Sequence, residues 1–236
     1  MDVGAVIAWF LDASHWAGSN GVPVRVVEHL VLSGLAIAIG AAVALPAGLA
    51  IGHTGRAERV AVAVAGLGRA VPSYALLILF VPFLGLGFAS ALPALVLLSI
   101  PPILVNAVAG LRDVDAETIE AGRGMGMTEW QVLRYVELPA ALPAIVAGLR
   151  TSAVQVVATA TLAALVAGGG LGRYIVDGFA LQRYDRLVAG AILVAVLALL
   201  TERAFTIAQR AFERRGGRPA EDAFGPMAPP AIVSGS

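Results

Sequence analysis

The chain has 236 residues, 58% of them hydrophobic and 14% charged, whereas soluble domains average about 45–50% apolar and about 25% charged residues; this excludes a fold surrounded only by water. The 16 basic residues are all arginine and balance 16 acidic residues, which excludes the basic surface of a nucleic-acid-binding protein. Cysteine is absent, and the histidines at 15, 29 and 53 lack metal-ligand spacing, so we expect no metal site and interpret them as interfacial or loop residues.

Residues 1–26 are predicted to form an N-terminal segment at the membrane surface. The apolar run from Val3 to Leu11 is too short to cross a bilayer, and no cationic stretch precedes it, so we do not expect a cleaved signal peptide. Trp9 and Trp16 favour the headgroup region, where aromatic rings with a polar edge are enriched. A frayed terminus is the alternative.

A membrane-spanning region is predicted over residues 27–208. A helix needs about 20 mostly apolar residues to cross about 30 Å of hydrocarbon, and this length applied to the sequence predicts about five spans. The expected spans are residues 28–52, a pair that begins near Arg59 and ends near Leu111, residues 139–166 and residues 187–207. No charged residue or histidine interrupts residues 70–111, a length that requires two crossings. The predicted fold class is therefore an all-α, multi-pass membrane helical bundle.

Residue type predicts two further features of the chain. Gly48 and Gly52 lie in the first span at the small-xxx-small spacing that lets two helices approach closely. Residues 209–236 are rich in Gly, Pro and Ala and are predicted to be a disordered cytoplasmic tail.

The distribution of arginine predicts the orientation. The arginines after the first span, those within 112–139 and those after residue 207 fall on one side of a five-span topology. By the positive-inside rule this side is the cytoplasm, which places the N-terminus outside and the C-terminus inside. Arg173, Arg183 and Arg186 then lie in an outer loop, an exception that a large re-entrant loop would explain.

The stretch 112–139 is the longest polar interruption and is predicted to form two short helices parallel to the membrane. Asp115 can cap the first helix, and Gly126 can form a sharp bend after it. Thr128 and Gln131 have the spacing of a capping box, which would start the second helix. Apolar side chains are expected to cover one side of that helix: Trp130, Val132, Leu133 and Val136.

This stretch resembles the EAA loop of permeases of ABC importers. The pattern of that loop is Glu-Ala-Ala, three residues, Gly, nine residues and Ile-x-Leu-Pro; here it reads Glu120-Ala121-Gly122, Gly126 and Val136-Glu137-Leu138-Pro139. The resemblance implies the fold of a type I importer permease and a loop that docks into a cytoplasmic ATPase subunit. It assigns this coupling role to Glu120, Ala121, Gly122, Gly126, Met127, Leu138 and Pro139. An ordinary amphipathic loop on the lipid surface is the alternative.

The same resemblance implies the partners. A Walker loop needs a lysine after its glycines and the chain has none, so ATP and Mg²⁺ are expected on a separate ATPase subunit and no cofactor in this chain. Two ATPases, a second permease that is identical or homologous, and an external solute-binding protein would complete an importer in the bacterial cell membrane. The chain itself is expected to be a transport subunit that works by alternating access, not an enzyme.

Three more stretches resemble the osmoprotectant permeases, which import glycine betaine, choline, carnitine or related compounds. They are Val71-Pro-Ser-Tyr-Ala-Leu-Leu77, Ala147-Gly-Leu-Arg-Thr151 and Gly168-Gly-Gly-Leu-Gly172. The resemblance implies a quaternary amine or proline-like solute. The glycine-rich run is also similar to methionine-type permeases, so an importer of methionine or another amino acid is the alternative.

The candidates for lining a solute pathway are polar or helix-breaking residues inside the spans: Arg69, Pro72, Ser73, Asn106, Arg150 and Gln155. The two arginines are expected near mid-bilayer, where a charge costs at least about 2.5 kcal/mol, and would meet a substrate carboxylate or pair with carbonyls at a helix interface. Pro72 removes a backbone hydrogen bond and Ser73 can bond the freed carbonyl, which suits a gate or a packing kink. Interhelical hydrogen bonds would explain the two amides equally well.

Two other function classes fit these residues less well. An ion-coupled secondary transporter usually places acidic residues within its spans, and an intramembrane hydrolase needs paired catalytic groups or a metal cluster at membrane depth. No Asp or Glu falls in the middle of a predicted span, since Glu202 lies in the last two turns of its span, and no such pair is present. An importer permease is therefore the favoured interpretation.

Overall fold

The computed structural model describes residues 3–215, without the side chains at positions 64, 67–70 and 211–215. All secondary structure in this range is helical, which confirms the predicted all-α class. The elements in chain order are α1 (Val3–Leu11), the 3-10 helix η1 (Ala13–Trp16), α2 (Val22–Thr54), α3 (Glu58–Ala70), α4 (Ser73–Leu79), α5 (Val81–Leu84), α6 (Phe88–Arg112), α7 (Ala116–Gly124), α8 (Glu129–Val132), the π-helix η2 (Leu133–Glu137), α9 (Leu138–Thr159), the 3-10 helix η3 (Ala160–Val166), α10 (Gly172–Ala180) and α11 (Tyr184–Arg215).

Four helical stretches are long and apolar enough to cross a membrane: α2, α6, the continuous stretch Glu129–Val166 and residues Tyr184–Arg210 of α11. The predicted second span is different, because the helix stops at Ala70 and resumes at Ser73. Pro72 is the N-cap of α4 with an extended backbone. A proline has no N–H and disfavours the helical conformation in the residue before it, so the expected kink is instead a full break.

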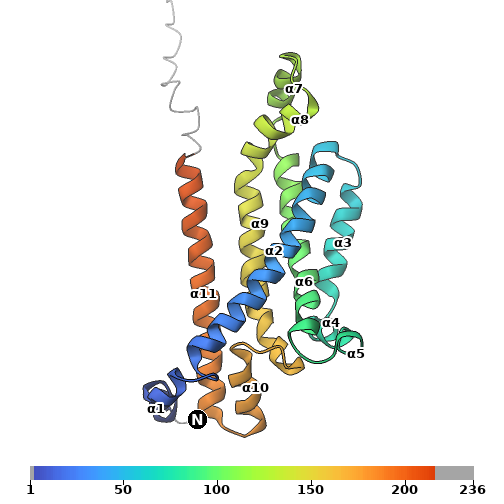
Figure 1. The fold of residues 1–236 in the computed structure, drawn as a ribbon. Helices are drawn as coiled ribbons and strands as arrows, with labels where there is room; N and C mark the ends of the chain where they lie inside the picture. Colours follow the sequence, from blue (N-terminus) through green and yellow to red (C-terminus); the bar gives the residue numbers. More distant parts are fainter. Residues whose placement is uncertain (1–2, 216–236) are drawn as a thin grey trace, which may run out of the picture.

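Figure 1 shows how these helices are arranged: α2 and α6 run in the same direction, α9 runs back in the opposite direction, and α11 again runs with α2. The chain passes through α3 and α4 on its way from the end of α2 to the start of α6, so the broken segment still takes the place of one crossing. The helix α1 lies at one end of the bundle, and α7, α8 and the last turns of α11 lie at the other. This arrangement agrees with the predicted topology of about five passes.

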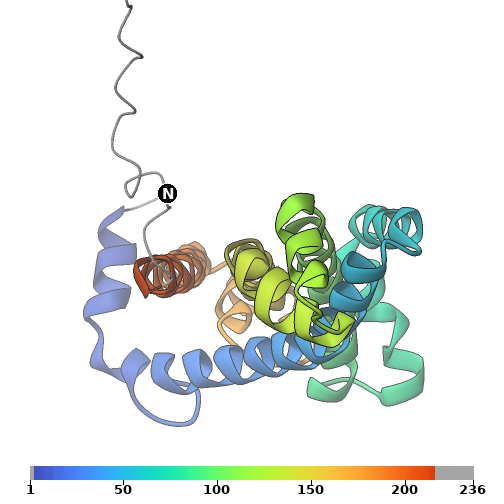
Figure 2. The same cartoon turned by 90° about the horizontal axis from the view of Figure 1, so that it is seen from above.

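The helix α2 crosses the bundle obliquely and packs closely on α6 (Figures 1 and 2). Its 33 residues extend about 50 Å, more than a hydrocarbon layer of about 30 Å, so it must tilt to stay within the membrane. A Cβ added to Gly48 would lie 2.7 Å from the Ala107 Cβ, and one added to Gly52 would lie 2.8 Å from the Leu111 Cβ. Both distances are too short for real atoms, so the structure confirms that these two glycines permit the close approach.

The helix α6 is shared by two close helix pairs and forms the centre of the bundle. On its α9 side, a Cβ on Gly110 would meet the Ala144 Cβ at 2.7 Å, and one on Gly148 would meet the Asn106 Cβ at the same distance. Most apolar side chains of α6 from Pro101 to Leu111 are buried, among them Ile103. Small residues therefore set the spacing of α2, α6 and α9, as is usual where lipid supplies no hydrophobic drive between helices.

The two ends of the chain depart from the predicted boundaries. The first long helix begins at Val22, earlier than the residue 27 expected for the membrane region. Ahead of it, α1 packs on α11 and α10 through Trp9, whose ring centroid lies 5.4 Å from that of Tyr174. At the other end, α11 continues to Arg215, so the predicted tail from residue 209 begins too early. Residues 216–236 of that tail lie outside the described residues.

Candidate functional site

The first short helix of the polar loop, α7, begins with the predicted cap. The Asp115 carboxylate accepts hydrogen bonds from the Thr118 backbone N–H at 3.0 Å and from the Thr118 hydroxyl at 2.9 Å. Both bonds favour the ionised form, which lowers the pKa of Asp115 from its ordinary value. The cap satisfies donors at the helix start that have no partner within the helix.

Gly126 ends this helix with the predicted sharp bend. Its φ is +84°, in the left-handed region that favours glycine. The Gly126 N–H donates to the Arg123 carbonyl at 2.9 Å, and the Met127 N–H donates to the Gly122 carbonyl at 3.2 Å. These two bonds make a Schellman motif, which satisfies the last carbonyls of a helix. Nothing lies within 4 Å of a Cβ built on Gly126, so backbone conformation and not crowding requires glycine here.

The second helix of the loop starts at the predicted capping box. The Thr128 N–H donates to the Gln131 side chain at 2.8 Å, and the Gln131 N–H donates to the Thr128 hydroxyl at 3.4 Å. Arg123 reaches across the turn and donates twice to the Glu129 carboxylate, at 3.0 and 2.9 Å. This bidentate pair lowers the pKa of Glu129 and joins α7 to α8.

Gly122 is the position where this chain departs from the Ala of the EAA pattern. It is buried, and a Cβ on it would lie 3.5 Å from both the Met127 Sδ and the Val136 Cγ2. These are ordinary van der Waals distances, so alanine would fit here. The departure therefore leaves the packing of the loop unchanged.

The apolar side chains of the second helix are predicted to cover one side together, and the structure differs from this prediction. Val132 is buried as expected, but Trp130 is 67% exposed. Met125 and Tyr135 are exposed as well, and the predicted coupling residues Glu120 and Ala121 are also on the surface. Large exposed apolar side chains on a polar loop at the end of the bundle indicate a surface for a protein partner.

Pro139 lies in the first turn of α9, the helix of the expected fourth span, but the chain is already helical when it reaches this residue. The π-helix η2 connects α8 directly to α9, and the Leu138 N–H donates to the Leu133 carbonyl five residues back. A π-turn shifts the hydrogen-bond register of the helix. Pro139 follows it in the first turn of α9, where a residue without an N–H leaves no backbone donor unpaired. Leu138 itself packs on the core formed by α6 and α9.

The C-terminal end of α2 contacts this loop through His53, a histidine for which the sequence alone indicates no partner. The His53 Nδ1 lies 2.6 Å from Oε2 of Glu137, which is buried, and its Nε2 lies 3.4 Å from Oε2 of Glu129. His53 and Glu137 are 84 positions apart, and no motif joins them. The available signal was a histidine in the last turn of a span, where a cation complements the helix dipole.

The N-terminal end of α2 is likewise held by two polar residues that sequence reasoning missed. The Glu28 carboxylate accepts from the Gly170 N–H at 2.9 Å and from Arg25 at 2.8 Å. His29 was predicted to be interfacial or in a loop, which is wrong: it is fully buried, and its Nε2 lies 2.8 Å from the Val157 carbonyl oxygen. A carbonyl is only an acceptor, so the Nε2 carries the proton. Val157 is among the last four residues of α9, whose carbonyls lack an α-helical partner.

The predicted pathway residues are not brought together. Asn106 donates to the Pro102 carbonyl in its own helix at 2.8 Å and packs against Gly148. Arg150 and Gln155 are half-buried on α9, and Ser73 is half-buried at the start of α4. No hydrogen bond or ion pair joins any two of these residues within the part of the chain that the structure describes. The side chain of Arg69 lies outside the described residues.

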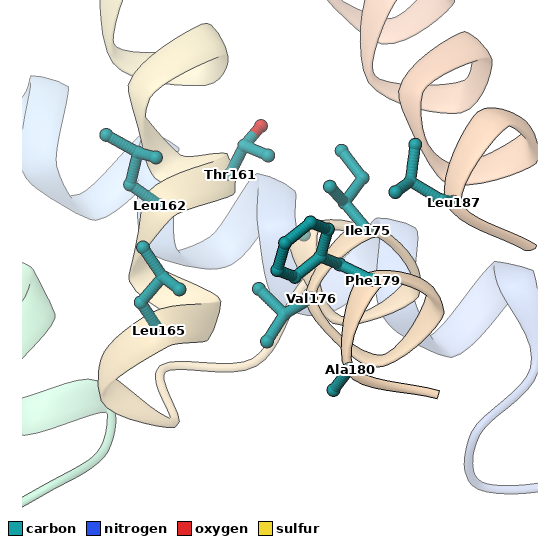
Figure 3. Close-up of a pocket in the computed structure, with 9 residues that line it drawn as sticks. Thr161, Leu162, Leu165, Ile175, Val176, Phe179, Ala180 and Leu187 are labelled. Atoms are coloured by element: carbon teal, nitrogen blue, oxygen red, sulfur yellow. The ribbon is translucent and has the colours of Figure 1, made fainter. Parts of the chain in front are cut away.

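An apolar cavity of about 300 Å³ lies between η3, α10 and α11 at the end of the bundle opposite the polar loop. Figure 3 shows Leu162 and Leu165 of η3 facing Val176 and Phe179 of α10 across it. Thr161 supplies the one polar side chain of its lining. With no charged side chain, this cavity lacks a group that would pair with an ionic solute, and we assign it no solute site.

A multi-pass helical bundle with a structured polar loop and an exposed apolar surface at one end is the class of membrane protein that docks a partner at that end. Residues 36–215 match the family model described as the binding-protein-dependent transport system inner membrane component. The match covers well over half of the chain, so this chain belongs to that family of ABC importer permeases.

Individual relatives agree with this assignment. The chain is 40% identical over 198 residues to the carnitine transport permease protein OpuCB of Listeria monocytogenes, which covers 84% of this chain and 88% of that protein. It is 36% identical over 189 residues to the glycine betaine/carnitine/choline transport system permease protein OpuCB of Bacillus subtilis, covering 80% and 87% of the two chains.

A solved structure of the MetNI methionine ABC transporter in an inward-facing conformation matches with a TM-score of 0.70 at 23% identity, covering 90% of this chain and 99% of that chain. At this identity the likeness establishes the fold alone. The fold predicted from the EAA resemblance, that of a type I importer permease, is confirmed.

Proposed function

We propose that this chain is the permease subunit of an ATP-driven importer that brings an osmoprotectant of the glycine betaine, choline or carnitine class into the cell. The observation that carries the proposal is the 36–40% identity, over at least 80% of the chain, to permeases named for these compounds. A choline transport system permease of Bacillus subtilis is similar to the same extent. Identity of this extent includes the helices that would line a solute pathway.

In this proposal the polar loop faces the cytoplasm and docks on a separate ATPase subunit. The exposed Trp130, Met125 and Tyr135 would enter the partner, and the arginines on this side of the topology support the cytoplasmic assignment. The ATPase binds ATP and Mg²⁺, a second permease completes the pore, and an external binding protein delivers the solute. ATP-driven closure of the ATPases then pushes on the loop, and the bundle alternates between outward and inward access.

The role proposed for Arg150 is a transient contact with the carboxylate of a solute such as glycine betaine. Its side chain is half-buried on α9, and it has no ion-pair partner among the described residues. A charge in a span needs a water-filled or ionic environment, which a solute pathway provides. The corresponding role of Arg69 rests on its sequence position alone.

The test is uptake by proteoliposomes that contain this chain, its ATPase and its binding protein. We expect uptake of labelled glycine betaine that requires ATP and is reduced by excess choline or carnitine, while the purified chain alone hydrolyses no ATP. Competition by methionine only would assign the chain to an amino-acid importer instead. Uptake by the chain alone, driven by an ion gradient, would contradict the proposal as a whole.

A further inference from the structure

The inner end of α2 meets the docking loop at one imidazole. His53 lies in the last turn of α2, and its side chain is only 14% exposed. Its two ring nitrogens face the carboxylates of Glu137 and Glu129, at 2.6 and 3.4 Å. Both ring nitrogens therefore face acceptor oxygens, and each contact is a hydrogen bond wherever its nitrogen carries the proton.

The two carboxylates come from the two sides of the π-helix in the loop. Glu129 is the first residue of α8 and also holds Arg123, whereas Glu137 is the last residue of η2. The Glu137 side chain is only 4% exposed, and a buried carboxylate is costly unless a cation or donor pairs with it. Among the described residues, His53 is the side chain that pairs with Glu137.

The position of Glu137 is the unspecified residue of the Ile-x-Leu-Pro pattern, so the loop resemblance gives it no role. The helix that carries His53 is continuous over 33 residues, and its outer end holds the Gly170 backbone through Glu28. A displacement of the loop that pulls on His53 therefore moves an element that reaches the opposite end of the bundle.

We propose that His53 is a positioning residue that transmits movement of the docking loop to α2 through its contacts with Glu137 and Glu129. This inference rests on the proposed function, because it concerns how the ATPase drives the bundle. The loop would reach the other spans through covalent connection to α6 and α9. It would reach α2 through the contacts of His53 with Glu137 and Glu129.

The experiment measures solute transported per ATP hydrolysed in the reconstituted importer. His53→Ala should keep ATP hydrolysis but lower this ratio about tenfold, the effect of losing one charged hydrogen bond. The matched control is Glu58→Gln, because Glu58 forms an exposed pair with Arg112 at the same end of the bundle, at 3.5 Å. We expect the control to keep the wild-type ratio. The ratio is independent of the amount of folded transporter, so a merely structural role for His53 would not change it.

A second variant covers the case in which His53→Ala alone does not fold, since that change leaves Glu137 buried and unpaired. The double variant His53→Ala with Glu137→Ala removes both groups and should fold, yet still show the lowered ratio. A wild-type ratio in either variant would overturn the inference. Failure of the wild-type importer to transport any osmoprotectant would overturn the proposed function instead, so the two failures are distinguishable.

Discussion

The loop of residues 112–139 is proposed to face the cytoplasm and is called the inner loop; the segment of residues 160–183, at the other end of the bundle, is called the outer segment. The two are built alike but held differently. Each contains short helical pieces joined by glycine of positive φ, Gly126 in the first and Gly169 and Gly170 in the second. A Cβ on Gly126 would meet nothing within 4 Å. One on Gly169 would lie 2.9 Å from Oε2 of Glu28, and one on Gly170 would lie 3.0 Å from Nδ1 of His29.

The contacts around these glycines differ, and they explain how each segment keeps its shape. The inner loop is stabilised mainly by its own caps, its Schellman turn and its bidentate ion pair, and it exposes its surface to a partner. The outer segment is stabilised by contacts with α2, α9 and α11. We therefore expect substitutions in the inner loop to impair coupling while the bundle stays folded, and substitutions in the outer segment to unfold it.

The largest expected effect is at Gly172, the first residue of α10. A Cβ there would collide with the backbone carbonyl oxygen of Thr161, and a backbone atom in a packed segment has little room to move. Gly172→Ala should lower the free energy of unfolding by about 3 kcal/mol, measured by thermal unfolding of the purified chain in detergent. The matched inner substitution is Gly124→Ala, which meets no atom within 4 Å and should leave stability unchanged or slightly raised. Equal losses of unfolding free energy in the two variants would contradict the proposed difference between the two segments.

The next effect is at His29, which joins α2 to the end of α9. His29→Ala removes the side chain that donates to the buried Val157 carbonyl. It should lower the free energy of unfolding by about 2 kcal/mol in the same experiment. His29→Gln keeps an N–H donor and should recover part of this loss. An alanine variant as stable as the wild type would show that the hydrogen bond between His29 and Val157 does not stabilise the fold.

A smaller effect is expected at Gly126, where the penalty is conformational only. Gly126→Ala places an L-residue in the left-handed region, at about 1–2 kcal/mol, and should weaken the turn locally. We expect faster amide exchange of Met127 and weaker binding of the ATPase, with the unfolding temperature of the bundle nearly unchanged. Cooperative unfolding of the whole chain at a much lower temperature would contradict the separation of the two regions.

The smallest effect concerns the Asp115 cap and pH. The folded pKa of Asp115 is lowered below its ordinary value of 3.8 by the Thr118 hydrogen bonds, so the cap contributes fully above that value. Its contribution is lost as the pH falls through the lower, folded pKa. The protection of the α7 amides, measured as their exchange rate relative to the intrinsic rate at each pH, should therefore fall below about pH 4 in the wild type. Asp115→Asn still accepts a hydrogen bond but does not ionise there, and it should lack this pH dependence.

The inner loop was largely predictable because its structure is local. The cap at Asp115, the capping box at Thr128 and the bend at Gly126 each depend on residues within five positions, so one sequence contains the whole signal. The fold class was predictable for a related reason, since apolar length alone identifies spans. The break before Ser73 was read as a kink, because sequence does not say how far a proline disrupts a helix.

The hydrogen bonds between residues far apart in the sequence were not predictable in this way. His29 contacts a carbonyl 128 positions away, and Glu28 contacts an amide 142 positions away. Which polar residue of a span finds a partner depends on helix rotation and tilt, and these follow from packing of the whole bundle. The exposure of Trp130 was missed for another reason: the amphipathic pattern of one helical turn is too short to specify which side faces the bundle.

The central claim is that the inner loop faces the cytoplasm and docks an ATPase, and single cysteines test it most directly. The chain has no cysteine, so Ala121→Cys in the loop and Leu181→Cys after α10 each introduce one exposed thiol. We predict that Ala121→Cys crosslinks to the ATPase and is labelled by an impermeant maleimide only from the cytoplasmic side, whereas Leu181→Cys is labelled only from outside. Labelling of the loop cysteine from outside, or its failure to capture the ATPase in the assembled importer, would contradict the account.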